Sequence, residues 1–234
     1  MSNTYFEFKQ FVVKHDRCAM KVGTDGVLLG AWTDVVQARR VLDIGTGTGL
    51  IALMAAQRSL EAQIDAIDID DGAVGQAVEN VSESPWKDRI RVWKEDVRTM
   101  RTNEEYDAIV SNPPFFTESV YCPDEKRNAA RHADGLGFDE LLDAVARLLA
   151  ANGTFSVVLP SNARDAFISQ AALRHLYIHR LTWVHTKATA APKRVLVELG
   201  RDIRAWMEDR LVITDGGTYS TEYRNLTQDF YLNF

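Results

Sequence analysis

Short apolar runs alternate with amphipathic stretches along most of this chain. From Arg40 onward, runs of strand length rich in Val and Ile are separated by stretches in which apolar residues recur at helical spacing. Strands that alternate with helices are typical of an α/β fold, in which helices cover a mostly parallel sheet. The expected strands are 41–44, 64–70, 90–94, 106–111, 154–159, 177–185 and 194–199, and the expected helices are 50–56, one that begins near Asp70, and 138–152.

Both ends of the chain extend beyond this alternation. Residues 5–14 alternate apolar and charged side chains, which favours a small β-hairpin. We expect a single domain over residues 1–234, with 1–35 as an N-terminal extension of hairpin and helix and 201–234 as a C-terminal extension. A chain of 234 residues that is 46% hydrophobic is long and apolar enough to form one substantial core.

A glycine-rich turn follows the strand predicted at 41–44. Gly45, Gly47 and Gly49 have the spacing Gly-x-Gly-x-Gly, unlike the Gly-x-Gly-x-x-Gly of dinucleotide sites. Glycines allow the backbone to approach a ligand closely. Asp43, just before the turn, would repel a pyrophosphate but suits a cationic group, such as the amino end of a methionine-derived cofactor. The turn therefore predicts a site for such a cofactor.

Two further aspartates lie within or just after predicted strands. Asp68 lies 23 residues after Gly45, near the separation at which an acidic residue accepts hydrogen bonds from ribose hydroxyls. Asp96 comes after the next strand, where a carboxylate can bind the amino group of a cofactor adenine. Asp70 and Asp71 are instead expected to begin the following helix, because carboxylates are favourable at its positive N-terminal end.

The sequence Asn112-Pro113-Pro114-Phe115 follows the strand predicted at 106–111. Two prolines cannot continue a sheet, so the chain leaves the strand in a stiff, extended conformation. The Asn112 side-chain oxygen and the Pro113 carbonyl can accept the two hydrogens of an exocyclic amino group, with Phe115 stacked on its ring. Both acceptors would stabilise the positive charge that develops on the nitrogen during methyl transfer. A simple turn is the alternative interpretation.

Together these motifs resemble those of the class I S-adenosylmethionine-dependent methyltransferases that act on amino groups, whose motif is Asp/Asn/Ser-Pro-Pro-Tyr/Phe/Trp. The resemblance implies a Rossmann-like, doubly wound sheet of seven mostly parallel strands, with an antiparallel last strand and helices on both faces. It implies S-adenosyl-L-methionine as the cofactor and Asn112 to Phe115 as the catalytic residues that hold the target base. The implied cofactor-binding residues are Asp43, Gly45, Gly47, Gly49, Asp68 and Asp96, with the neighbouring Ile69 and Val97. Apart from the resemblance, Thr24 lies near a glycine and is expected to close over the methionine end of the cofactor, with a helix cap as its alternative role.

A narrower resemblance rests on segments outside those motifs. Residues 21–32 (KVGTDGVLLGAW), 130–132 (ARH), 219–223 and 229–232 are similar to the bacterial tRNA-valine adenine-N6 methyltransferases, which modify the purine beside the anticodon. This resemblance implies a transferase that methylates the N6 amino group of an adenine in the anticodon loop of a valine tRNA.

Three other functions stay open on the sequence. A glutamine side-chain amide offers an NH₂ group to the same acceptors, so a protein glutamine-N5 methyltransferase of the release-factor type is the first alternative. Those enzymes carry Tyr where this chain has Phe115, and a separate helical domain for which the residues before Val41 are too few. An rRNA guanine-N2 methyltransferase would use the same chemistry. A non-catalytic RNA binder would use the cofactor pocket structurally.

The charge distribution indicates where RNA would bind. A net charge of −6 argues against a broad, sequence-blind nucleic-acid coat. Basic residues gather in the loop after Phe115 and in the turn between the last two predicted strands. Both groups favour contact with an RNA backbone, and a solvated surface is the alternative. The predicted RNA contacts are Lys126, Arg127, Arg131, His132, Lys187, Lys193 and Arg194.

The composition also disfavours several classes of protein. No apolar run approaches the roughly 20 residues of a membrane span, and the first residues form no signal peptide, so we expect a cytoplasmic protein without membrane contact. Cys18 and Cys122 lack metal-ligand spacing, so we expect neither a metal site nor a disulfide framework. No feature of the sequence indicates an obligate protein partner.

Overall fold

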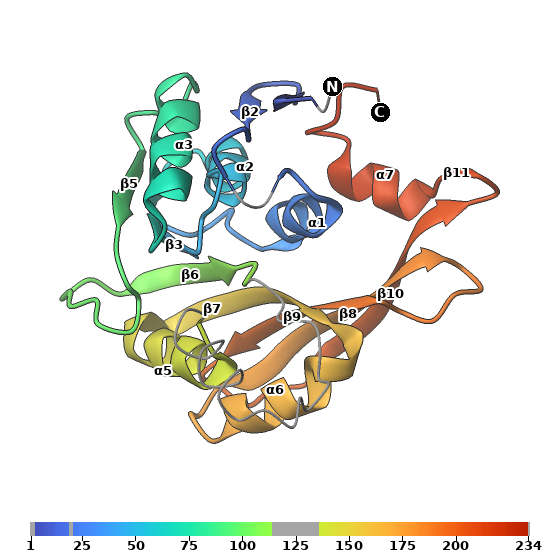
Figure 1. Cartoon of the computed structure of the whole chain (residues 1–234). Coiled ribbons are helices and arrows are strands. Elements are labelled where there is room, and N and C mark those ends of the chain that lie inside the picture. The colour runs from blue at the N-terminus through green and yellow to red at the C-terminus, as the bar shows by residue number, and fades with distance from the viewer. Residues whose placement is uncertain (1–2, 19–20, 114–135, 234) are drawn as a thin grey trace, which may run out of the picture.

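The predicted strands form one large sheet in the computed structural model, which describes residues 3–18, 21–113 and 136–233. Within these residues the sheet has nine strands. They are β3 (Arg40–Ile44), β4 (Gln63–Asp68), β5 (Ile90–Lys94), β6 (Tyr106–Ser111), β7 (Leu149–Pro160), β8 (Tyr177–Lys187), β9 (Arg194–Gly200), β10 (Met207–Asp215) and β11 (Thr218–Tyr219). Across the sheet their order is β11-β10-β8-β9-β7-β6-β3-β4-β5 (Figure 1).

The strand directions agree with the predicted fold class. Strands β3 to β7 run parallel to one another, and β9 lies antiparallel between β7 and β8. The α/β class, the mostly parallel sheet and the antiparallel last strand are therefore confirmed. The seven expected strands correspond to β3 to β9. The C-terminal part of the chain extends this sheet, because β10 pairs in parallel with β8 and β11 pairs with β10.

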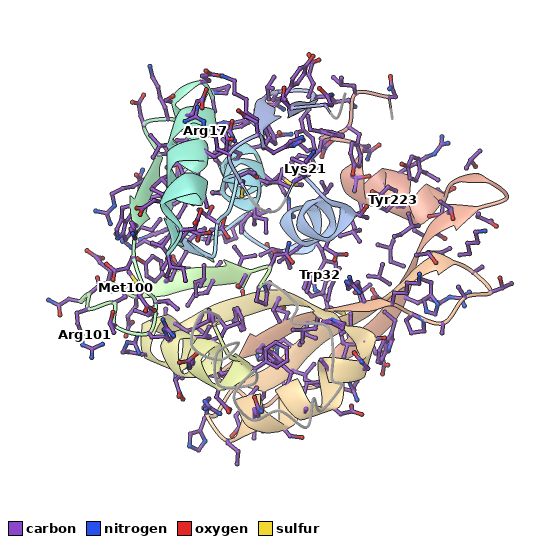
Figure 2. All side chains as sticks on the ribbon, viewed as in Figure 1. Arg17, Lys21, Trp32, Met100, Arg101 and Tyr223 are labelled. Carbon is purple, nitrogen blue, oxygen red and sulfur yellow. The ribbon has the colours of Figure 1, made fainter. Side chains whose placement is uncertain are left out.

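Helices cover both faces of the sheet (Figure 1). One face carries α1 (Thr24–Trp32), α2 (Leu50–Arg58), α3 (Asp71–Ser82) and α7 (Thr221–Thr227), and the other carries α5 (Phe138–Leu148), the short 3-10 helix η1 (Ser161–Ala163) and α6 (Arg164–Ala172). Leu141 and Leu142 of α5 are fully buried in one apolar cluster with Phe155 of β7. On the opposite face, Trp32 lies between α1 and the sheet (Figure 2), and its indole N–H donates to the Thr182 hydroxyl oxygen at 2.9 Å.

The alternating N-terminal segment forms the predicted hairpin. Its strands β1 (Tyr5–Glu7) and β2 (Val12–Lys14) pair antiparallel. The hairpin packs against the C-terminal end of the chain, because the Lys9 amide donates to the Phe230 carbonyl at 2.8 Å. Phe8 and Phe230 are buried in the same apolar cluster. The two ends of the chain are therefore held together beside the main sheet (Figure 1).

Two predicted boundaries are wrong. The helix expected at 138–152 ends at Leu148, because the next residue already pairs with Tyr106 as the first residue of β7. Gly153 is therefore not a helix terminator. A Cβ atom there would lie 2.7 Å from the Tyr106 carbonyl oxygen, so the glycine permits close approach of two strands. The strand expected at 64–70 ends at Asp68, because Asp70 caps α3 by accepting the Ala73 amide at 2.7 Å.

Candidate active site

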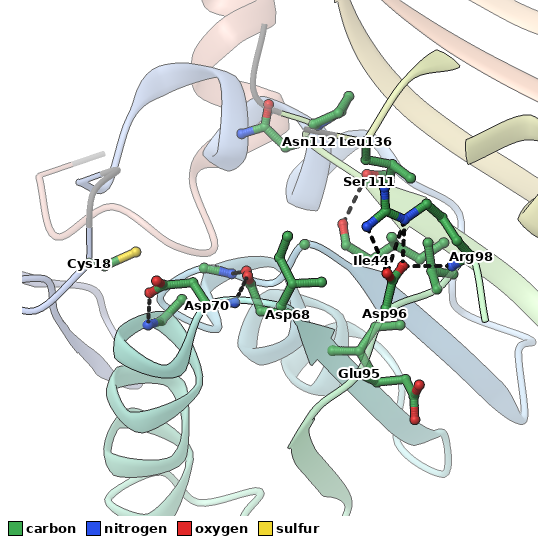
Figure 3. A pocket seen from close by; sticks show the side chains of 17 residues that line it. Cys18, Ile44, Asp68, Asp70, Glu95, Asp96, Arg98, Ser111, Asn112 and Leu136 are labelled. Atoms are coloured by element: carbon green, nitrogen blue, oxygen red, sulfur yellow. Dashed lines mark hydrogen bonds and ion pairs between the residues drawn. The ribbon is translucent and has the colours of Figure 1, made fainter. Parts of the chain in front are cut away.

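A cavity of about 230 Å³ opens at the carboxyl ends of β3, β4 and β6 and beyond the end of β5 (Figure 3). Ligands of open α/β sheets bind at this edge, where the loops after parallel strands converge. The volume is several times the roughly 30 Å³ of one water molecule, so the cavity has room for an organic ligand. Eight of the predicted site residues line it, namely Gly45, Gly47, Asp68, Ile69, Asp96, Val97, Asn112 and Pro113.

The glycine turn holds its backbone open toward this cavity. Gly45, Gly47 and Gly49 all have positive φ angles, of 71°, 56° and 81°. No atom lies within 4 Å of the position that a Cβ on Gly45 would occupy, so the turn leaves space there for a ligand. Gly49 does not line the cavity. It caps α2 in the left-handed conformation, where a Cβ would lie 3.3 Å from the Cβ of Ala77.

Asp68 ties the glycine turn to the end of β4. Its Oδ2 accepts the Gly47 amide at 2.9 Å, and its Oδ1 accepts the Asp70 amide at 3.0 Å. A carboxylate with two oxygens can accept about four hydrogen bonds, so each oxygen retains capacity for a ligand hydroxyl. Asp68 therefore combines a position at the cavity wall with a structural role in the turn (Figure 3).

Asp96 also lines the cavity and is bound by Arg98. The Arg98 guanidinium donates from Nε to Asp96 Oδ1 at 2.9 Å and from Nη2 to Oδ2 at 2.7 Å (Figure 3). These hydrogen bonds hold the pKa of the Asp96 carboxyl below its ordinary value. Val97 is buried beside them, and the Arg147 guanidinium donates to its carbonyl at 2.7 Å. The carboxylate is consequently ionised and fixed at this wall.

Asn112 follows directly after β6, as predicted. The preceding Ser111 donates its hydroxyl to the Ile44 carbonyl at 2.9 Å, which joins the ends of β6 and β3. A Cβ on Gly26 of α1 would lie 3.7 Å from Asn112 Nδ2, so the first turn of that helix supports the amide group. Asn112 Oδ1 is buried and has no hydrogen-bond partner among the described residues. Buried acceptors are normally satisfied, so this oxygen is suited to accept a hydrogen from a ligand.

Asp43 is completely buried one position before the cavity wall. Its Oδ2 accepts the Thr46 hydroxyl at 2.7 Å. Burial raises the pKa of the Asp43 carboxyl from its ordinary value of 3.8 to about 7, although the Thr46 hydrogen bond opposes this change. Asp43 itself does not line the cavity, so its contact with a cofactor stays a prediction.

Comparison with known proteins places this site in a family. The methyltransferase small domain model matches residues 20–175. A tRNA1(Val) (adenine(37)-N6)-methyltransferase of Phocaeicola vulgatus is 53% identical over 234 residues, which cover 100% of both chains. Proteins with the same name from Bacteroides thetaiotaomicron (50% identical, 100% of this chain and 99% of the relative) and Serratia proteamaculans (47%, 97% and 89%) are also similar.

The chain belongs to the tRNA1(Val) (adenine(37)-N6)-methyltransferase family.

Solved structures share the fold of this methyltransferase at lower identity. A predicted O-methyltransferase from Agrobacterium tumefaciens has a TM-score of 0.68 at 18% identity and covers 88% of this chain and 96% of its own. A glycopeptide N-methyltransferase complexed with S-adenosylmethionine has a TM-score of 0.57 at 13% identity and covers 78% and 100%. At these identities the likeness shows the fold alone.

Several predicted site residues of the methyltransferase lie elsewhere. Thr24 is the exposed first residue of α1 and does not line the cavity. Gly23 is the N-cap of that helix, so the alternative role of Thr24 as a cap is wrong. Six predicted residues lie outside the described residues, namely Pro114, Phe115, Lys126, Arg127, Arg131 and His132.

The predicted RNA contacts between β8 and β9 lie at the same edge of the sheet as the cavity. Strand β8 ends at Lys187 and β9 begins at Arg194, and Arg194 pairs with Pro160 at the end of β7. Lys187 and Lys193 are exposed. Arg194 is half-buried and donates from Nε to Asp25 Oδ2 at 2.8 Å, so it also anchors the first turn of α1.

Sequence reasoning did not identify several of the cavity residues. The only sign of Arg98 in the sequence is its position two residues after Asp96. An aspartate side chain can accept hydrogen bonds from the amide and the side chain of the second residue after it. Cys18 lines the cavity near Gly47, and nothing in the sequence connects these two positions. Ser111 and Leu136 also line it.

The donors and acceptors of this site fit S-adenosyl-L-methionine. The space beside Gly45 is open to a ligand against the backbone, and Asp68 places a carboxylate at the cavity wall, as the predicted role with ribose hydroxyls requires. In the described part of the chain, no cluster of three or more His, Cys, Asp or Glu residues is arranged to hold a metal ion. None of the described helices is long and apolar enough to cross a membrane.

The buried Asp43 predicts a pH-dependent stability difference. The folded protein retains the Asp43 proton up to about pH 7, whereas the unfolded chain releases it near the ordinary pKa of 3.8. Between these values the folded state binds more protons, so the contribution of Asp43 to stability falls as the pH rises. We expect Asp43→Asn to increase the unfolding free energy by about 1–2 kcal/mol at pH 8, because the loss of the charge-assisted Thr46 hydrogen bond offsets part of the gain.

Urea unfolding of the Asp43→Asn and wild-type proteins from pH 4 to pH 8 measures this difference. It should shrink toward pH 4, where the carboxyl is protonated in both states. A difference that does not change with pH would contradict the assignment of the raised pKa to Asp43.

Proposed function

We propose that this protein transfers the methyl group of S-adenosyl-L-methionine to N6 of adenine 37 in tRNA1(Val). The observation that carries the proposal is that Asn112 lines the cavity together with the glycine turn and Asp68, and that its buried Oδ1 has no hydrogen-bond partner in the described part of the chain. The full-length relatives that carry this name, at 47% to 53% identity, support the same substrate.

The chemistry at this site follows from the acceptors. An adenine amino group is a poor nucleophile because its lone pair is delocalised into the ring. Asn112 Oδ1 and the Pro113 carbonyl would accept its two hydrogens and favour a more tetrahedral nitrogen. They would also stabilise the positive charge that develops there. The cofactor supplies a methyl group on a cationic sulfur. As the N6 lone pair forms the new N–C bond, the S–C bond breaks to a neutral thioether, and the extra proton passes to solvent.

The target adenine has to leave its stack to reach this cavity, and an anticodon loop presents unstacked bases more readily than a duplex does. Lys187 and Lys193 are exposed at the same sheet edge, so we assign them to the RNA backbone near the target. A tRNA substrate also favours a cytoplasmic protein. The tRNA is the one partner that this proposal requires.

We expect the double variant Lys187→Ala/Lys193→Ala to bind tRNA about 10-fold more weakly and to lower the slope of log affinity against log salt by about 1.5. Filter binding across a salt series measures both quantities. The matched control is Arg39→Ala/Lys87→Ala, which removes two exposed charges at the opposite edge of the sheet. Equal losses of tRNA affinity in the two double variants would show that the effect comes from the net charge rather than from contacts of Lys187 and Lys193.

The substrate class is tested by incubating the purified protein with radiolabelled S-adenosylmethionine and separate pools of unmodified tRNA, unmodified rRNA and cellular protein. We expect label in tRNA, recovered after digestion as N6-methyladenosine. Label in protein would move the assignment to the glutamine-N5 alternative, and guanine-N2 label in rRNA would move it to the rRNA alternative. No label in any pool would favour the non-catalytic binder.

A further inference from the structure

Arg98 donates three N–H groups to the two carboxylate oxygens of Asp96, with Nε shared between them. Oδ1 accepts the Arg98 amide at 2.9 Å and the guanidinium Nε at 2.9 Å, and Oδ2 accepts Nε at 3.0 Å and Nη2 at 2.7 Å. Two carboxylate oxygens offer about four lone-pair positions in total. A cofactor adenine that enters the cavity therefore competes with the guanidinium for the two oxygens of Asp96 (Figure 3).

Displacing Arg98 without a replacement partner is unfavourable. The Asp96 and Arg98 side chains are 31% and 33% exposed, so both charges lie partly in the cavity wall. A guanidinium that leaves a bidentate carboxylate there exchanges charge-assisted hydrogen bonds for weaker ones to water. An adenine amino group therefore takes the place of Arg98 on Asp96 more readily if a second carboxylate receives the arginine.

That second acceptor is Glu140 in the first turn of α5. Its Oε1 lies 3.5 Å from Arg98 Nη1, which makes it, within the described residues, a second carboxylate beside this guanidinium. The Oε2 atom is engaged separately, because it accepts the Gly137 amide at 2.9 Å as part of the cap of α5. One oxygen of a fixed carboxylate is therefore available to Arg98 within a small side-chain movement.

We propose that Arg98 moves from Asp96 to Glu140 when the adenine of the cofactor binds, and so determines recognition of the adenine amino group. The proposal rests on the assignment of S-adenosylmethionine to this cavity. In the exchange, Asp96 loses the guanidinium donors and gains the exocyclic amino group. The distance between the Arg98 guanidinium and the Glu140 carboxylate becomes shorter. Glu140 is thus a positioning residue that acts through Arg98 and touches no reacting atom.

The test is calorimetric titration of the full-length protein with S-adenosylhomocysteine, which needs no RNA and no turnover. We expect Glu140→Gln to weaken binding about 3- to 10-fold, because Arg98 then has no anionic partner to receive it. Glutamine still accepts the Gly137 amide, so the helix cap is retained. The matched control is Asp139→Asn, the neighbouring acid of the same helical turn, which pairs with Arg174 instead and should leave the affinity unchanged.

Two comparisons separate exchange from simple structural damage. In an Arg98→Met background, binding should equal that of the wild type or be up to about 10-fold tighter, and Glu140→Gln should add no further loss. With S-inosylhomocysteine, whose ring carries an oxygen in place of the amino group, Glu140→Gln should have no effect because Arg98 stays on Asp96.

Opposite results would overturn the proposal. They are an unchanged affinity in Glu140→Gln, an equal penalty with the inosyl ligand, or a large loss in Arg98→Met, which would show that Arg98 supports binding directly. Arg98→Lys, which keeps the charge, provides a second variant if the methionine variant does not fold. Failure of the wild-type protein to bind S-adenosylhomocysteine or S-adenosylmethionine would instead remove the cofactor assignment itself, so the two failures are distinguishable.

Discussion

Replacement of Asn112 by alanine is expected to lower kcat about 30- to 1000-fold, which corresponds to the loss of roughly 2–4 kcal/mol of transition-state stabilisation. The Oδ1 atom is buried and has no partner among residues 3–18, 21–113 and 136–233, so its hydrogen bond is available to the developing charge on the substrate nitrogen. The affinity for S-adenosylhomocysteine should change little, because Asp68 and the glycine turn are unaltered. Single-turnover methylation of tRNA and calorimetric titration measure the two quantities.

The control for this variant is Asn103→Ala, which removes the same side chain from an exposed loop before β6. It should behave as the wild type. If Asn112→Ala methylated tRNA at a rate near that of the wild type, the amide would have no part in catalysis and the cavity would need another means of activating the amine.

Replacement of Asp68 by alanine is expected to weaken S-adenosylhomocysteine binding about 100-fold or more, since two charge-assisted hydrogen bonds are each worth roughly 1.5–3 kcal/mol. The variant would lose the proposed acceptor for the ribose hydroxyls. It would also release the Gly47 and Asp70 amides, which Asp68 holds at 2.9 and 3.0 Å. The first change removes a proposed contact with the cofactor, and the second removes hydrogen bonds that hold the glycine turn at the cavity wall.

Asp71→Ala is the matched control, because this carboxylate lies three positions later, is 82% exposed and pairs with Lys94 at the surface. Calorimetry should find its affinity unchanged. An Asp68→Ala protein that folds and binds with wild-type affinity would exclude Asp68 from the cofactor site.

The sequence was sufficient for those parts of the fold that local pattern determines. Parallel strands are buried on both faces and therefore appear as short apolar runs, and β3 to β6 lie close to where such runs predict them. The helix boundary at Leu148 could not be placed in this way. Residues 149–152 continue the pattern of α5, and only pairing with Tyr106 of β6 makes them part of β7. That pairing is a tertiary interaction without a local signal.

In the candidate site, too, the sequence predicts some features and not others. Motif spacing placed Gly45, Gly47, Asp68, Asp96 and Asn112 together, because loops after parallel strands meet at one edge of the sheet. Motif spacing does not predict which groups each of these side chains contacts in the folded chain. The pairing of Asp96 with Arg98, and of Arg194 with Asp25 across the fold, depends on side-chain geometry that no sequence pattern specifies.

The central claim is that the amino group of one adenine is the methyl acceptor. The most direct measurement is incubation of the protein and S-adenosylmethionine with an unmodified tRNA1(Val) transcript and with a second transcript that carries guanine at position 37, followed by nuclease digestion and mass spectrometry of the fragments. We expect one methyl group per molecule, on N6 of adenine 37, in the first transcript and none in the second. A methyl group elsewhere, or equal methylation of both transcripts, would contradict the assignment.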